Sequence, residues 1–219
     1  GRAMTSGRNN SIVGAHAGDA ITSGSHNALL GTLAGTTLTT GSYNVGVGNY
    51  SMNDATTGNF NHAFGYQTLY KLTTGTGNIS MGYQSGYYGF GSSHNVFIGH
   101  EAGQGDTDSG SPSKSHNVYI GNTAGKKSRT TTDNIGIGRE ALWTNQGGTG
   151  NIGIGLTALR DTSSSYNTAV GYNSGNAMTS GAYNTIIGSF SGNAGGLDIR
   201  TSSNNIVLSD GAGNISQWY

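Results

Sequence analysis

The stretch Asn151-Ile152-Gly153-Ile154-Gly155 contains the pattern that decides the fold of this chain. The pattern is an asparagine, two variable residues, an apolar residue and a glycine, and it recurs twelve times, with serine replacing the glycine in the last copy. Eight of the eleven steps between copies are 17 residues long. The asparagines are Asn10, Asn27, Asn44, Asn61, Asn78, Asn95, Asn117, Asn134, Asn151, Asn167, Asn184 and Asn205. A fixed period of this kind predicts a repeat architecture of stacked units.

Seventeen residues hold two short strands and two turns, so each unit predicts one coil of a β-solenoid. Side chains alternate along a strand, so the second and fourth pattern positions share one face. Both positions are apolar in Asn95-Val96-Phe97-Ile98, and we therefore expect this pair to point into the core. The third position is then expected to point outward. Its large apolar members are Ile12, Leu29, Phe97, Tyr119, Ile186 and Val207.

Other positions of the unit have predicted structural roles. Because the asparagine keeps its place in every coil, we expect a ladder in which each amide donates to the next coil and accepts from the last. The glycine after the strand is expected to supply a positive φ. The side chain at one repeat position, which precedes the second turn, is expected to fill a corner of the core. The residues at this position include Met4, Ile21, Leu38, Leu72 and Met178.

Composition narrows the class of protein. The 219 residues include 40 glycines, one proline, no cysteine, and ten basic against ten acidic residues. This disfavours a helical bundle and excludes collagen, disulfides and zinc–thiolate sites. No apolar run is long enough to cross a bilayer, and zero net charge argues against nucleic acid or an anionic membrane as the main partner. The opening Gly1-Arg2-Ala3-Met4 is expected to be the interior of a longer protein.

One coil of this size encloses a thin core, so a single chain buries little apolar area per residue. We therefore expect several copies to pack side by side, with the third-position side chains at an interface that cyclic symmetry closes. The sequence thus predicts an all-β fold: a parallel β-solenoid of about twelve 17-residue coils, packed as a homotrimer.

The unit Ser165-Tyr166-Asn167-Thr168-Ala169-Val170-Gly171-Tyr172-Asn173-Ser174-Gly175 resembles two known kinds of repeat. It is similar to the head repeats of trimeric autotransporter adhesins and to the Asn-Thr-Ala-Ile-Gly repeats of bacteriophage tail fibres. The autotransporter heads are left-handed parallel β-rolls of three side-by-side chains, with a unit somewhat shorter than 17, which favours the tail-fibre comparison. The resemblance covers about residues 3–210 and concerns architecture more than biological role.

The segment from Asn204 to Asn214 resembles the stretch that precedes an autocleaved, trimerising intramolecular chaperone in many tail fibres and tailspikes. The resemblance implies two parts, a solenoid over residues 1–203 and a C-terminal cap segment over 204–219 that formerly preceded the chaperone.

Two insertions interrupt the period, and loops on a rigid scaffold are favoured binding positions. The first contributes Asp106, Asp108 and Lys114 as candidate receptor contacts, and the second contributes Asp198 and Arg200. A tolerated insertion without a partner is the equally weighted alternative. The first insertion also begins like a calcium loop, but it lacks the later acidic ligand of an EF-hand.

Tyr87, Tyr88 and Phe90 are the preferred candidates for carbohydrate contact, because they place three aromatic rings in a segment otherwise rich in Thr, Ser and Gly. Packing between chains is an equally weighted explanation. The residue before each asparagine is often Tyr, Phe or His, which indicates a structural stripe. Glu101 and Glu140 are expected roughly 10 Å apart, beyond the separation that a glycosidase pair uses. We expect no enzymatic activity, no cofactor and no metal site.

These inferences favour a structural and adhesive segment of a phage tail fibre, extracellular on the virion. Its expected partners are two further copies of the chain, a host-surface glycan or protein and other tail components, without nucleic-acid binding or membrane insertion. The alternatives are the head of a bacterial trimeric autotransporter and, less favoured because regular Thr-x-Thr ranks are absent, an ice- or surface-binding solenoid.

Overall fold

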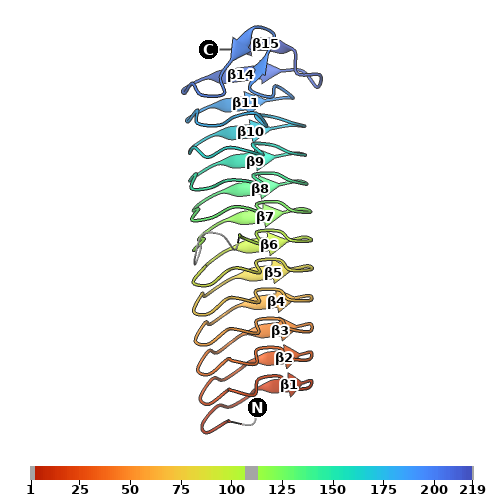
Figure 1. Ribbon diagram of the computed structural model, residues 1–219, viewed down its shortest axis with the longest axis vertical. Coiled ribbons are helices and arrows are strands. Elements are labelled where there is room, and N and C mark those ends of the chain that lie inside the picture. The colour runs from red at the N-terminus through yellow and green to blue at the C-terminus, as the bar shows by residue number, and fades with distance from the viewer. Residues whose placement is uncertain (1–2, 107–112, 219) are drawn as a thin grey trace.

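The chain folds into an elongated stack of short β-strands, shown by the computed structural model in Figure 1. The structure describes residues 3–106 and 113–218, and these residues contain no helix. The strands are β1 (Ser11–Val13), β2 (Ala28–Leu30), β3 (Val45–Val47), β4 (His62–Phe64), β5 (Ile79–Met81), β6 (Val96–Ile98), β7 (Val118–Ile120), β8 (Ile135–Ile137), β9 (Ile152–Ile154), β10 (Thr168–Val170), β11 (Thr185–Ile187), β12 (Asn193–Ala194), β13 (Leu197–Asp198), β14 (Ile206–Ser209) and β15 (Ile215–Trp218).

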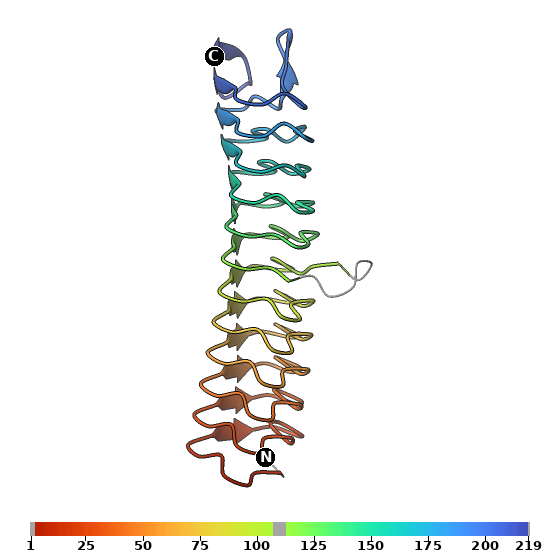
Figure 2. The same cartoon turned by 90° about the vertical axis from the view of Figure 1, so that its left-hand side faces the viewer.

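The predicted parallel β-solenoid is confirmed. Strands β1 to β11 and then β14 pair in parallel and in sequence order, and β15 adds an antiparallel thirteenth strand to the same sheet. Each pairing keeps the repeat in register, as where Ile12 lies beside Leu29. Eleven parallel pairings give about eleven turns, one fewer than expected. Figure 2 shows the strands along one side of the rod and the turns along the other.

The two faces of the strands are the reverse of the prediction. The third-position side chains of Leu29, Phe97, Tyr119 and Ile186 are at most 1% exposed, so they form the core rather than an interface. The second and fourth positions lie on the outward face, where Val13 is 63% exposed. Strand alternation determines which residues share a face, but it does not determine which face is inside.

Core volume is shared between two positions of each coil, which explains why glycine can occupy the inward position. Where the third position is large, the residue eight after the asparagine is glycine: a Cβ on Gly103 would lie 2.4 Å from Cδ1 of Phe97. Where the third position is Gly46, Met52 fills the space, and a Cβ on Gly46 would lie 3.0 Å from Cε of Met52. In most coils one large side chain therefore fills the core from either position, and the exceptions are the β5 coil with Ser80 and Gly86 and the β10 coil with Ala169 and Gly175.

The asparagine ladder is confirmed, although its direction differs from the prediction. The Oδ1 atom of Asn44 accepts from the backbone N–H and Nδ2 of Asn61 at 3.0 and 3.2 Å, so each amide oxygen accepts from the next coil. The Nδ2 group of Asn44 donates back to Oδ1 of Asn27 at 3.1 Å and forward to the carbonyl of Gly58 at 2.9 Å. Burial of these amides is therefore compensated by hydrogen bonds to both neighbouring coils.

The predicted bend and corner residues are also found. Gly14 has a φ of 137°, and a Cβ there would lie 2.3 Å from the carbonyl oxygen of Gly31. The corner side chains are fully buried at Ile21, Leu38, Leu72 and Met178. Met4 is the exception, at 44% exposed, because it lies in the first coil at the end of the stack.

The C-terminal end of the core is covered by irregular elements. Strands β12 and β13 form a two-stranded antiparallel hairpin, and β15 turns back over β14. Ala194, Leu197 and Ile215 from these elements pack against the buried core. Strand β14, within the segment 204–219, still continues the parallel sheet in register with β11.

Candidate functional site

The outward face of the sheet carries ten of the eighteen exposed large hydrophobic residues in the part of the chain that the structure describes. Its fourth-position column is apolar in all twelve repeats, and the second-position column is mostly Val and Ile. The large, exposed members of the two columns are Val13, Leu30, Phe64, Ile79, Met81, Ile137, Ile154, Ile187, Ile206 and Leu208. Parallel sheets are almost always covered on both faces, and contiguous exposed apolar surface marks an interaction site. We call this surface the sheet face.

The sheet face has one edge two residues before each strand, which we call the leading edge. Its rings stack from coil to coil, with centroids 4.8 Å apart for His26 and Tyr43 and 5.0 Å apart for Tyr43 and Phe60. After an interruption at Gly77, His94 and His116 form a second stack in the same row, with centroids 5.1 Å apart. Each of the residues in these stacks has a left-handed φ of 56° to 60°. The predicted structural stripe is thus confirmed, and the histidines are members of it.

The other edge lies two residues after each strand, and we call it the trailing edge. Here Tyr66, Tyr83 and His100 stack with centroid separations of 5.7 and 5.0 Å. Tyr66 and Tyr83 are 43% and 45% exposed. The stack therefore extends over three successive coils and is partly exposed to solvent.

A second row of rings adjoins the trailing edge. Tyr70 and Tyr87 stack at 4.9 Å, and Tyr88 meets Tyr87 edge-on at 4.5 Å. Tyr50 connects the two rows through contacts with Tyr66 and Tyr70. We call these seven rings the aromatic band: Tyr50, Tyr66, Tyr70, Tyr83, Tyr87, Tyr88 and His100.

Of the three predicted carbohydrate contacts, the structure brings only two together. Tyr87 and Tyr88 belong to the aromatic band, and burial raises the pKa of Tyr87, so its hydroxyl remains a neutral donor at physiological pH. Tyr70 covers one face of the Tyr87 ring, which leaves at most one face for a sugar. Phe90 is half-buried and bridges to Leu72 through its backbone, and among the described residues it shares no ring contact.

The charged candidates of the first insertion lie in different environments. Asp106 forms an ion pair with Arg129 at 3.1 Å, and Asp108 lies outside the described residues. Lys114 is completely buried: its Nζ donates to the carbonyl of Gly103 at 2.6 Å and lies 5.5 Å from the Phe97 ring centroid. Burial lowers the pKa of Lys114 to about 7, and its amine is out of reach of a macromolecular receptor.

In the second insertion, Asp198 and Arg200 bind each other. The Arg200 guanidinium donates from Nε and from the terminal nitrogen to the two carboxylate oxygens of Asp198, at 3.0 and 2.7 Å. These hydrogen bonds lower the pKa of Asp198. Both side chains remain exposed, so this pair stays accessible to a ligand.

Glu101 and Glu140, the two carboxylates weighed as a glycosidase pair, each form an ion pair with a cation. Glu101 binds Lys126 at 2.7 Å, and Glu140 binds Arg160 at 3.1 Å. Within the described ranges, no group of three or more His, Cys, Asp or Glu side chains could hold a metal ion. These contacts connect neighbouring coils through ion pairs at the surface of the rod.

Several surface rows escaped the sequence predictions. Trp143 lies between two cations from adjacent coils, with Nζ of Lys127 4.6 Å and Cζ of Arg160 4.7 Å from its ring. Gln84 links Gln67 and a third glutamine one coil on through amide hydrogen bonds of 2.7 and 2.9 Å. Both rows join side chains of neighbouring coils, although some members are not one full period apart: Gln84 and Gln104 are separated by 20 residues, and Lys127 and Trp143 by 16.

Comparisons with protein-family models, with curated proteins and with solved structures find no match to this chain. In the part of the chain that the structure describes, there is no helix long and apolar enough to cross a membrane.

Proposed function

We propose that this chain is a structural and adhesive segment of a bacteriophage tail fibre that acts as a side-by-side homotrimer. The observation that carries the proposal is the sheet face, an apolar surface along the whole rod. The resemblance of the repeat to tail-fibre and autotransporter units supports the biological setting.

The sheet face replaces the third-position residues as the proposed interface. A flat row of parallel strands with apolar side chains is costly to leave in water, and covering it with further copies removes that cost. Cyclic symmetry closes such an assembly, since each copy offers the same surface to its neighbours. Three rods around one axis bury all three sheet faces and leave the turns outside.

The aromatic band is the proposed adhesive surface. A stiff trimer presents three copies of it, so weak contacts with a repetitive glycan add up through effective concentration. Tyrosine hydroxyls and the free ring faces at the ends of the stacks supply hydrogen bonds and apolar contact to a sugar. The autotransporter head would use the same surfaces, and the biological setting distinguishes the two.

An ice-binding role is less favoured. The threonine hydroxyls along one turn are engaged by the protein itself: Oγ1 of Thr39 donates to the carbonyl of Thr56 at 3.0 Å, and Oγ1 of Thr56 donates to Thr73 at 3.0 Å. Hydroxyl groups that bind the next coil are not free to order a layer of water.

Light scattering tests the assembly. The chain of 22.3 kDa is expected to have three times that mass in solution. Ile137→Lys with Ile154→Lys, on the sheet face, should give monomers that keep their β-structure by circular dichroism. Thr130→Lys, on an exposed turn, is the matched control and should stay trimeric. A monomeric wild-type chain would overturn the proposal.

A glycan array tests adhesion. The trimer is expected to bind a subset of glycans, and Tyr87→Ser with Tyr88→Ser should weaken that binding about ten-fold or more. Phe90→Ser, outside the aromatic band, is the control. Unchanged binding by the double variant would remove the aromatic band as the contact, and no binding by the wild type would leave the rod as a spacer.

A further inference from the structure

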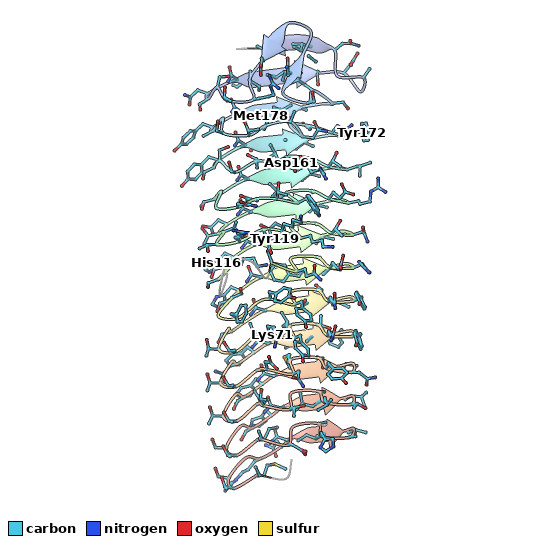
Figure 3. All side chains as sticks on the ribbon, in the orientation of Figure 1. Lys71, His116, Tyr119, Asp161, Tyr172 and Met178 are labelled. Atoms are coloured by element: carbon cyan, nitrogen blue, oxygen red, sulfur yellow. The ribbon has the colours of Figure 1, made fainter. Side chains whose placement is uncertain are left out.

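The leading and trailing edges of the sheet face carry matching residues. In Figure 3, His116 of the leading edge and Tyr172 of the trailing edge project from opposite ends of the strands. Beside β1 to β11 the leading edge consists of Asn9, His26, Tyr43, Phe60, Gly77, His94, His116, Asp133, Gly150, Tyr166 and Tyr183. The trailing edge beside the same strands consists of Ala15, Thr32, Asn49, Tyr66, Tyr83, His100, Asn122, Arg139, Leu156, Tyr172 and Ser189.

Each edge contains one residue from among Asp, Glu, Lys and Arg. On the leading edge it is Asp133, on the trailing edge it is Arg139, and both flank the same strand, β8. Both side chains are exposed, and neither has an ion-pair partner within the described part of its own chain. An acid and a base at the same level on opposite edges are complementary between copies, not within one.

The geometry of a closed ring brings these edges together. When parallel copies turn their sheet faces toward a common axis, the leading edge of each copy meets the trailing edge of the next at the same height. We propose that Asp133 of one copy forms an ion pair with Arg139 of its neighbour and that this pair sets the axial register of the assembly. The inference rests on the proposed homotrimer.

A device of this kind is needed because the sheet face is periodic. Sliding one copy by one coil, about 4.8 Å, would still place apolar columns against apolar columns. After such a slip Asp133 would face Asn122 or Leu156 of its neighbour, and its charge would lose its partner. A polar pair that fixes the register of an otherwise uniform apolar seam has the role of the single polar core position in coiled coils.

Other residues at equal height are compatible with this register but do not select it, because a slip of one coil would also pair aromatic rings, Tyr43 with Tyr66 and Phe60 with Tyr83. Phe60 would meet Tyr66 of the neighbouring copy, and Tyr166 would meet Tyr172, so aromatic rings face aromatic rings. The exposed rings of the two edges are then partly covered in the assembly. The second row of the aromatic band, which contains Tyr87 and Tyr88, lies beyond the trailing edge and remains available for a ligand.

Charge reversal tests the pair. Asp133→Arg and Arg139→Asp are each expected to raise the trimer dissociation constant about ten-fold or more at low salt, because like charges face each other at three seams. The combination of both changes should restore the wild-type value. Asp133 has a φ of 57°, close to that of its Tyr and His counterparts, so a long side chain is tolerated there.

Cysteine pairing tests the register, because the chain contains no cysteine. Asp133→Cys with Arg139→Cys should oxidise to a covalently closed trimer. Asp133→Cys with Leu156→Cys, one coil out of register, should give little cross-linking. A trimeric wild type whose reversals have no effect and whose in-register cysteines do not cross-link would overturn this pair and leave the homotrimer standing, whereas a monomeric wild type would overturn both.

Discussion

The rod contains two hydrophobic cores that fill the same backbone in different ways. The first core extends from Ala17 to Leu72, and the second extends from Phe97 to Val207. They are separated at the coil of β5, where both core positions are small, Ser80 and Gly86. The corner residues of the first core are all apolar, although Ala55 is small. In the second core, three successive coils have a buried polar residue at the corner.

The polar corners satisfy their own hydrogen bonds. The hydroxyl of Ser128 donates to the carbonyl of Gly125 at 2.7 Å, and the side chain of Asn145 binds both backbone groups of Gly148. The second core compensates with aromatic rings, since Phe97 and Tyr119 stack at 5.8 Å. The asparagine ladder and the glycine bends are therefore common to the coils of both cores, whereas the residue type at the corner varies.

The largest expected effect is at an apolar corner. Leu38→Ala should lower the free energy of unfolding by about 3 kcal/mol, because it leaves a cavity in the first core. Ser128→Ala, at the equivalent corner of the second core, should cost about 1 to 2 kcal/mol, since it removes the hydrogen bond to Gly125 and the interaction with the buried Tyr119 hydroxyl. Urea denaturation measures both, and equal losses would contradict the distinction between the cores.

Lys114 is a further buried polar side chain of the second core. Replacement of its amine by an apolar group should stabilise the protein. The pKa of Lys114 in the fold is about 7, below the ordinary value of 10.5, so the unfolded chain binds a proton between these pH values and the folded chain does not. Stability should therefore rise as the pH increases from about 7 to about 10.5 and stay level below that range.

Lys114→Met should raise the free energy of unfolding at pH 7 by about 2 kcal/mol or more and remove this dependence. Urea midpoints at several pH values between 6 and 10 provide the measurement. Lys127→Met is the control: it removes only the contact of an exposed amine with the Trp143 ring, so it should cost at most about 1 kcal/mol and leave the pH dependence unchanged. A loss of stability in Lys114→Met would show that the bond to Gly103 outweighs the cost of burial.

The ladder should contribute equally to both cores. Asn44→Ala in the first core and Asn134→Ala in the second each leave buried backbone groups without partners and should each cost about 2 kcal/mol. Both amides bind the coils on either side with similar distances. If thermal denaturation showed unequal losses of stability in the two variants, the two cores would differ in their backbone hydrogen bonding and not only in the side chains that fill them.

The sequence was sufficient to predict the period, the parallel solenoid, the asparagine ladder and the glycine bends, because each depends on residues that recur in register. It did not reveal which face is inside. Apolar side chains occupy both faces of the strands. Glycines such as Gly153 at the inward position also made that position look unlike a core position. The reciprocal sizes of Gly153 and Leu159 within a coil were the signal that could have identified it.

The candidate site was less predictable. Tyr87, Tyr88 and Phe90 are predicted as three rings of one segment, whereas the structure places Tyr87 and Tyr88 in a band of seven rings that does not include Phe90. Lys114 was expected on a loop and is buried. Asp133 and Arg139 gain meaning only once the outward face is known, since their relation depends on the two edges of that face.

The most direct test of the proposed assembly is the reactivity of single cysteines with maleimide. Ile154→Cys lies on the sheet face and Thr130→Cys on an exposed turn, and both side chains are open to solvent in a single chain. If the sheet face is the interface, the cysteine at 154 should react at least about ten-fold more slowly than the cysteine at 130, and equally fast after unfolding in urea. Equal, rapid labelling of both positions in the native protein would contradict the account.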